Sequence, residues 1–220
     1  MPTDNDNSSP RVLIISLHYQ DVFEESCGRL LAQLRSKATV QLVKDPVLAI
    51  QVLESRPSAI LITDEALTLK ENALVWDAVL RCVREGCTAL LMGQFSSFVQ
   101  PNKIQPLVAK AGLSWEPGAY NRTTVVVNRA ATGDELAQKL PTSYSQKALF
   151  LQNVAPSDAW YTTDEDSVIE SHVFYPDSAH RPGQSPVAMA RVGHGNLGYT
   201  GDVNSEQGTD AVVLAMCGLI

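Results

Sequence analysis

Several short apolar runs of the sequence are followed by polar side chains that could act as acids, bases or ligand contacts. His18 and Tyr19 follow the run 11–17, and Asp64 follows the run 58–63. A histidine beside a carboxylate can transfer protons, and a serine or cysteine on a sharp strand-to-helix turn can act as a nucleophile. Seven such residues form the predicted ligand-binding site: His18, Tyr19, Asp64, Gln94, Ser96, Asp202 and Asn204.

The segment 92–97 (MGQFSS) is the place where a nucleophile would be expected. A nucleophile elbow needs small residues on both sides of the reactive one, because the turn is tight. Here Gly93 is followed by Gln94 and the bulky Phe95, and Ser96 comes too late and lacks a second glycine. We therefore predict a loop whose hydroxyl groups cap the next segment, and no catalytic residue.

Metal and cofactor sites are not indicated by the cysteine and glycine patterns. The cysteines form no CxxC pair and have no histidine at metal-ligand spacing, so they are interpreted as free, small core residues: Cys27, Cys82, Cys87 and Cys217. The segment 201–208 lacks the acidic ladder of a calcium loop, and we expect Asn204 or Ser205 to cap the helix that follows it. The sequence therefore predicts no cofactor and no metal.

Charge and hydropathy exclude two classes of partner. The chain of 220 residues has a formal net charge of −7, and its 17 Lys and Arg residues are scattered, which argues against nucleic-acid binding. No apolar stretch approaches the roughly 20 residues of a membrane helix. Residues 1–10 are polar and acidic and predict a disordered leader rather than a signal peptide. We expect one domain over residues 11–220, located in the cytoplasm and also in the nucleus.

The elements that position the candidate residues alternate between strand and helix. The apolar runs 11–17, 39–43, 58–63 and 88–92 predict buried strands, and amphipathic stretches at 22–36, 47–55 and 72–84 predict helices between them. Such βαβ units predict an α/β fold with a doubly wound, mostly parallel sheet in three layers, as in flavodoxin. Ligands of such sheets bind beyond the carboxyl ends of the strands, which is where the candidate residues follow.

The second half of the sequence predicts a different pattern. We expect extended segments at 113–115 and 123–128 around a turn at Pro117 and Gly118, a strand at 147–154, and weak alternation over 167–175. Residues 187–192 and 197–200 predict a late antiparallel hairpin about the turn 193–196. Helices are expected at 104–111 and 209–217.

The order of these segments resembles the class I glutamine amidotransferase-like superfamily, and most closely its ThuA-like and β-galactosidase-trimerisation branches. The resemblance rests on RVLIISL, SAILITD, REGCTALLMGQF and PVAMARVGHGNLGYTGDVN, and it extends over most of residues 11–217. Active members of the superfamily carry a cysteine in a GxCxG elbow after the strand that TALLM resembles, with a histidine and an acid after a late strand. Here Gln94 or Phe95 stands at the cysteine position, and Gly201, Asp202 and Val203 follow the late strand. The resemblance thus implies that this triad, and its amide hydrolysis, is absent.

Three functions remain as hypotheses. The first is a catalytically degenerate amidotransferase-like domain that binds a protein partner, a second copy of itself or a small polar metabolite. The alternative is a hydrolase or sugar-modifying enzyme in which His18 and Asp64 or Asp202 form an acid–base pair. A flavodoxin-like electron carrier is disfavoured, because LHYQD follows the first strand where a phosphate-binding loop rich in Gly, Ser and Thr would be needed.

Overall fold

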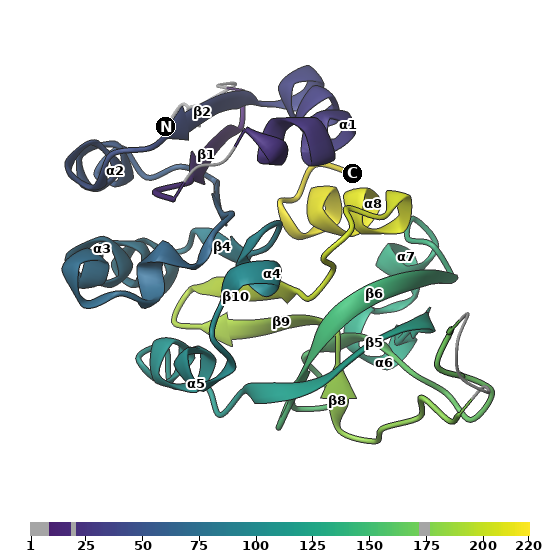
Figure 1. Cartoon of the computed structure of the whole chain (residues 1–220). Helices are drawn as coiled ribbons and strands as arrows, with labels where there is room; N and C mark the ends of the chain where they lie inside the picture. The colour runs from purple at the N-terminus through teal and green to yellow at the C-terminus, as the bar shows by residue number, and fades with distance from the viewer. Residues whose placement is uncertain (1–8, 19–20, 172–176) are drawn as a thin grey trace.

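The computed structural model describes residues 9–18, 21–171 and 177–220 (Figure 1). Most of the expected leader, the candidate Tyr19 and the end of the stretch 167–175 lie outside the described residues. Within the described chain, the strands form one ten-stranded sheet in the order β2-β1-β3-β4-β10-β9-β7-β5-β6-β8. The first five strands of this order are parallel, and the remaining pairings are antiparallel.

The parallel half is built from the apolar runs of the sequence. Its strands are β1 (Arg11–Ile15), β2 (Thr39–Val43), β3 (Ala59–Ile62), β4 (Thr88–Leu91) and β10 (Gly195–Thr200). Every residue of β3 is buried, as expected for a strand that is covered by helices on both faces. Because these strands are parallel, their carboxyl ends meet at one edge of the sheet, and this edge carries the candidate residues.

Helices cover both faces of the sheet, which confirms the doubly wound, three-layer arrangement (Figure 1). One face packs against α2 (Pro46–Leu53), α3 (Ala73–Arg84) and α5 (Pro101–Ala109). The other face packs against α1 (Val22–Lys37), α7 (Asp134–Ala137) and α8 (Gln207–Met216). Shorter helical turns complete the connections: η1 (Glu65–Thr68), η2 (Lys70–Asn72), α4 (Phe95–Phe98) and α6 (Arg129–Thr132).

The antiparallel half contains the expected hairpin and extends well beyond it. β9 (Val187–Val192) pairs with β10 across the two-residue turn Gly193-His194. Gly193 has a φ of +63°, and a Cβ there would lie 2.8 Å from the Cα of Arg84, so only glycine fits this turn. The sheet then continues through four further strands: β7 (Ala159–Thr162), β5 (Glu116–Val127), β6 (Ser143–Gln152) and β8 (Gln184–Ser185).

Two expectations about this half were wrong. Residues 113–115 are not in a strand, and the chain does not turn at Pro117 and Gly118, because β5 runs through both residues. The pairing of β5 with β6 shifts register between Pro117 and Tyr120. A bulge in β5 therefore contains the proline and glycine that the sequence pattern indicated as a turn.

None of the helices in the described ranges is both long and apolar enough to span a membrane.

Candidate functional site

The carboxyl edge of the parallel strands gathers the loops that follow β1, β3, β4 and β10. His18 lies after β1, Asp64 after β3, Gln94 and Ser96 after β4, and Asp202 and Asn204 after β10. The topology therefore brings six of the seven predicted residues to one edge. Several of their side chains, however, form hydrogen bonds within the loops that carry them. Tyr19, the seventh, is outside the described residues.

Asp64 fastens the loop after β1 to the loop after β3. Its Oδ2 accepts hydrogen bonds from the hydroxyl of Ser16 at 3.1 Å and from the backbone N–H of His18 at 2.9 Å. Its Oδ1 accepts from the N–H of Ala66 at 3.1 Å and thereby caps η1. The side chain is buried, and this burial raises the pKa of its carboxyl group. Asp64 therefore holds the loops in place rather than facing a ligand.

His18 pairs with a residue that the sequence analysis did not single out. Its Nδ1 lies 2.9 Å from Oε1 of Glu65, and the two side chains are 46% and 23% exposed. This hydrogen bond raises the pKa of His18, with smaller contributions from the charges of Glu65, Asp64 and Glu71. The imidazole partner at this edge is thus Glu65, whereas Asp64 or Asp202 was expected.

The turn after β4 has a positive φ at Gly93, a residue that has no side chain. Gly93 follows β4 with a φ of +63°, the region that a nucleophile adopts at a sharp strand-to-helix turn. The sequence resemblance placed Gln94 or Phe95 at the nucleophile position, and Gly93 directly precedes them. A Cβ on Gly93 would meet Phe23 Cε2 and the Thr63 carbonyl oxygen at 3.5 Å, which is ordinary contact.

The neighbours of Gly93 have contrasting roles. Ser96 is buried, and its hydroxyl donates to the carbonyl of Thr200 at 3.0 Å and contacts the hydroxyl of Tyr199 at 3.2 Å. Ser96 therefore joins the loop to β10 inside the core and does not face a ligand. Gln94 is 9% exposed, and its side-chain amide has no hydrogen-bond partner within the part of the chain that the structure describes. Of the two, Gln94 is the residue that can contact a ligand.

Asp202 shapes the loop between β10 and α8. Its Oδ1 accepts from the N–H of Asn204 at 2.8 Å, and its Oδ2 accepts from the N–H of Glu206 at 2.7 Å and the hydroxyl of Thr209 at 2.5 Å. The carboxyl group is buried, which raises its pKa. The expected caps at Asn204 or Ser205 were wrong, because α8 begins at Gln207 with Glu206 at its N-cap and has no side-chain cap.

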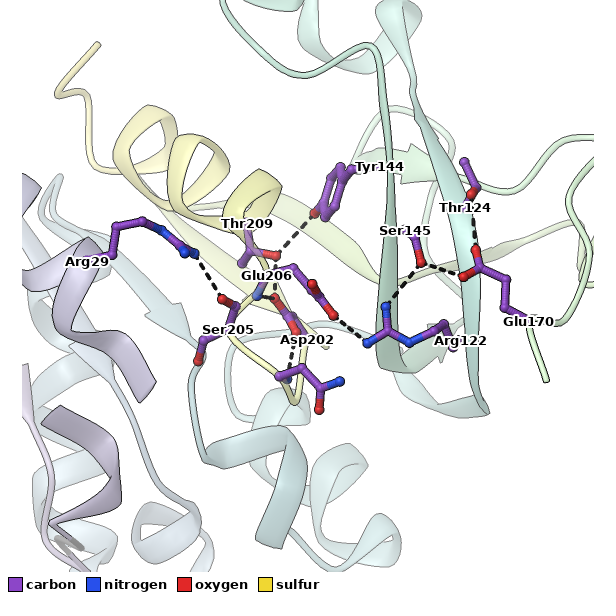
Figure 2. A network of polar contacts seen from close by, with 11 residues as sticks. Arg29, Arg122, Thr124, Tyr144, Ser145, Glu170, Asp202, Ser205, Glu206 and Thr209 are labelled. Carbon is purple, nitrogen blue, oxygen red and sulfur yellow. Dashed lines mark hydrogen bonds and ion pairs between the residues drawn. The ribbon is translucent and has the colours of Figure 1, made fainter. Parts of the chain in front are cut away.

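A larger polar network surrounds this loop and includes residues that sequence reasoning missed (Figure 2). Arg122 on β5 contacts Glu206 at 2.5 Å and donates to Ser145 at 3.1 Å, and the amide of Asn204 also faces its guanidinium group. On the other side, Arg29 of α1 pairs with Asp210 and donates to the Ser205 carbonyl at 3.0 Å. No sequence pattern indicated Arg122, because the strand that carries it was expected to begin at residue 123.

The cavities of the molecule do not follow the candidate residues. At the carboxyl edge, a cavity of about 10 Å³ lies between Cys27, Gly93 and Asp202, enough for about one water molecule. A groove of about 300 Å³ lies instead between α2 and α3, where both helices end before β3 and β4 begin. This groove is at the amino edge of the strands, and sequence reasoning did not predict it. No group of three potential metal ligands occurs among the residues that the structure describes.

Comparison with known proteins identifies the fold. A ThuA-like protein from Bacteroides uniformis ATCC 8492 matches with a TM-score of 0.59 and 12% identity over 97% of this chain and 92% of that chain. A cytoplasmic protein from Salmonella typhimurium LT2 matches with a TM-score of 0.54 and 14% identity over 95% and 96% of the two chains. A β-galactosidase from Bacillus circulans sp. alkalophilus matches with a TM-score of 0.57 and 12% identity over 96% of this chain but only 31% of that enzyme.

The sequence itself matches no family model and no curated protein at a significant level. The chain has the fold of these ThuA-like proteins, as its segment order predicted. At identities this low, the likeness concerns the fold alone.

Proposed function

We propose that this chain is a catalytically degenerate glutamine amidotransferase-like domain that acts as a binding or assembly module. The observation that carries the proposal is the turn after β4, where Gly93 has a φ of +63° and carries no side chain. A nucleophile of the amidotransferase kind acts from that position, and glycine has no side chain to supply one.

The hydrogen bonds of the surrounding loops support the same proposal. The carboxyl groups of Asp64 and Asp202 are buried and accept bonds from their own loops, and the Ser96 hydroxyl is bonded inside the core. What this edge offers to a partner is the amide of Gln94 together with the exposed pair of His18 and Glu65. These groups can donate and accept hydrogen bonds without performing hydrolysis.

The small cavity at this edge favours a protein partner over an enclosed metabolite. Pockets that bury small ligands usually have roughly 300–1,000 Å³, whereas about 10 Å³ is available here. A protein, including a second copy of this chain, can instead lie across the loops. We place this module in the cytoplasm, in agreement with the description of the Salmonella typhimurium protein of like fold.

Native mass spectrometry of the tagged protein, purified gently from its host, tests the proposal. We expect a stoichiometric protein partner or a dimer with the wild type, a weakened complex with Gln94→Ala, and an unchanged complex with Gln138→Ala, an exposed glutamine after α7. A wild-type chain that carries no partner, or equal retention by both variants, would contradict the proposed module.

The alternative, an enzyme with different chemistry, is favoured by one observation. His18 and Glu65 form a hydrogen-bonded imidazole–carboxylate pair at the edge where substrates of this fold class bind. The alternative requires that His18→Ala abolish the turnover of a substrate. The proposed binding or assembly module requires only that His18→Ala alter the binding of the partner.

A further inference from the structure

The end of α3 brings two cysteines together through its backbone. The N–H of Cys87 donates to the carbonyl of Cys82 at 3.0 Å, and the N–H of Gly86 donates to the carbonyl of Val83 at 3.0 Å. These two bonds define a Schellman motif, in which the side chains of the first and last residues characteristically touch. Gly86, with a φ of +124°, provides the turn. The motif therefore places one thiol at each of its two contact positions.

The backbones of Cys82 and Cys87 are close enough for a disulfide. A hydrogen bond of 3.0 Å between N and O, together with standard bond lengths, limits the distance between the two Cα atoms to about 7 Å. Disulfides bridge Cα atoms at roughly 4.4–6.8 Å. Both cysteines are free and are only 6% and 8% exposed.

The two thiols influence each other and become unequal. The neighbouring Cys87 thiol lowers the pKa of Cys82, Arg81 and Arg56 act in the same direction, and burial and the charge of Glu85 oppose the shift. The same contact raises the pKa of Cys87. As a neutral thiol, Cys82 donates to the carbonyl of Leu53 at 3.3 Å. Of the two sulfurs, Cys82 is the one that lines the groove between α2 and α3, so a reagent in the groove meets Cys82 first and Cys87 second.

The groove between α2 and α3 gives a small reagent a route to Cys82. Cys82 lines this groove of about 300 Å³, together with Arg56, Arg81 and Glu85. The other two cysteines are in a different situation, because burial raises the pKa of Cys27 and raises that of Cys217 to about 12. Oxidation should therefore select the pair at the end of α3.

We propose that Cys82 and Cys87 form a redox-active dithiol that hydrogen peroxide, or a small organic hydroperoxide entering the groove, oxidises to an intramolecular disulfide. The Cys82 thiolate attacks one peroxide oxygen, an S–O bond forms, the O–O bond breaks, and the released hydroxide takes up a proton as water. The Cys87 sulfur then attacks the Cys82 sulfenic acid, the S–O bond breaks, and the departing hydroxide takes the thiol proton as a second water. Two thiols and one hydrogen peroxide thus give one disulfide and two water molecules, and an organic hydroperoxide gives its alcohol in place of the first water.

Peptide mapping of the wild-type protein tests the proposal directly. The folded protein is treated with one equivalent of hydrogen peroxide, the remaining thiols are alkylated after denaturation, and the chain is digested with trypsin. Cleavage after Arg81 and Arg84 places the two cysteines on separate peptides, 82–84 and 85–103. We expect these peptides to be linked, with an intact mass lower by about 2 Da, and a reducing agent to restore both thiols. Full alkylation of Cys82 and Cys87, or a link to Cys27 or Cys217, would overturn the proposal.

Single variants distinguish the roles of the two sulfurs. In Cys87→Ser, peroxide should leave a sulfenic acid on Cys82 that a 1,3-diketone such as dimedone labels. In Cys82→Ser, Cys87 should be labelled much less than Cys82 is in Cys87→Ser, because only Cys82 lines the groove, and Cys217→Ser should still form the linked peptides. Labelling of Cys87 in Cys82→Ser to the same extent would overturn the assignment of Cys82 as the attacking sulfur, and the wild-type mapping does not depend on how these variants fold.

Discussion

The imidazole Nδ1 of His18 lies 2.9 Å from the carboxylate Oε1 of Glu65, and this contact joins the loops after β1 and β3. The hydrogen bond stabilises the protonated imidazole, so the pKa of His18 is raised above its ordinary value of 6.5. The contribution of this hydrogen bond to the stability of the folded protein is fully present below pH 6.5, and it is lost as the pH rises through the higher pKa that His18 has in the folded state. Because both side chains are partly exposed, the effect on stability should be small.

We expect Glu65→Gln to lower the pKa of His18, since it removes the negative partner. An NMR titration of the His18 ring protons measures this shift. Glu135→Gln, on the exposed surface of α7, serves as the control and should leave the titration unchanged. An unaltered His18 titration in Glu65→Gln would mean that the pair does not exist in solution.

Asp202 is expected to act in folding more than in binding. Asp202→Ala removes the acceptor for the N–H groups of Asn204 and Glu206 and for the hydroxyl of Thr209. Loss of these buried hydrogen bonds to a carboxylate should lower the free energy of unfolding by about 2 kcal/mol. Urea denaturation measures the change, and Asp166→Ala, at an exposed position, is the control. Equal midpoints for the two variants would contradict this role.

Two glycines should respond to alanine in opposite directions. A Cβ on Gly195 would lie 2.0 Å from the Cys87 carbonyl oxygen and 2.3 Å from that of Val83, so Gly195→Ala must displace backbone and should cost about 3 kcal/mol. Gly28 is on α1 with open space around it, so Gly28→Ala should stabilise the fold by roughly 0.5–1 kcal/mol through helix propensity. Calorimetric melting of both variants should show a fall for the first and a rise for the second. The reverse order would contradict the close packing of β10 on the end of α3.

The parallel half of the fold could be predicted because its signals are local. Residues 59–62 are all apolar and all buried, which is the pattern expected of a strand covered on both faces. The antiparallel half depends on a bulge in β5. The bulge lets the strand continue through Pro117 and Gly118, two residues whose types indicate a turn in the sequence. A four-residue strand such as β7 offers too little pattern to be recognised in the sequence.

The candidate site could be predicted by position but not by role. The rule that loops after parallel strands share an edge placed His18, Asp64, Gln94 and Asp202 correctly. A carboxylate faces its own loop when backbone N–H groups of that loop point towards it. The direction of these N–H groups cannot be predicted from residue types. For the same reason, the pairing of Cys82 with Cys87 follows from the turn at Gly86 and not from a spacing rule for cysteines.

Glutamine hydrolysis is the measurement that tests the central claim most directly. The folded protein is incubated with glutamine labelled at its amide nitrogen, and the release of labelled ammonium is followed by NMR. Because Gly93 leaves the elbow without a nucleophile, we predict a rate no different from that of the heat-denatured protein. Release of ammonium in proportion to the concentration of folded protein, retained through a further purification step, would contradict the account of a degenerate domain.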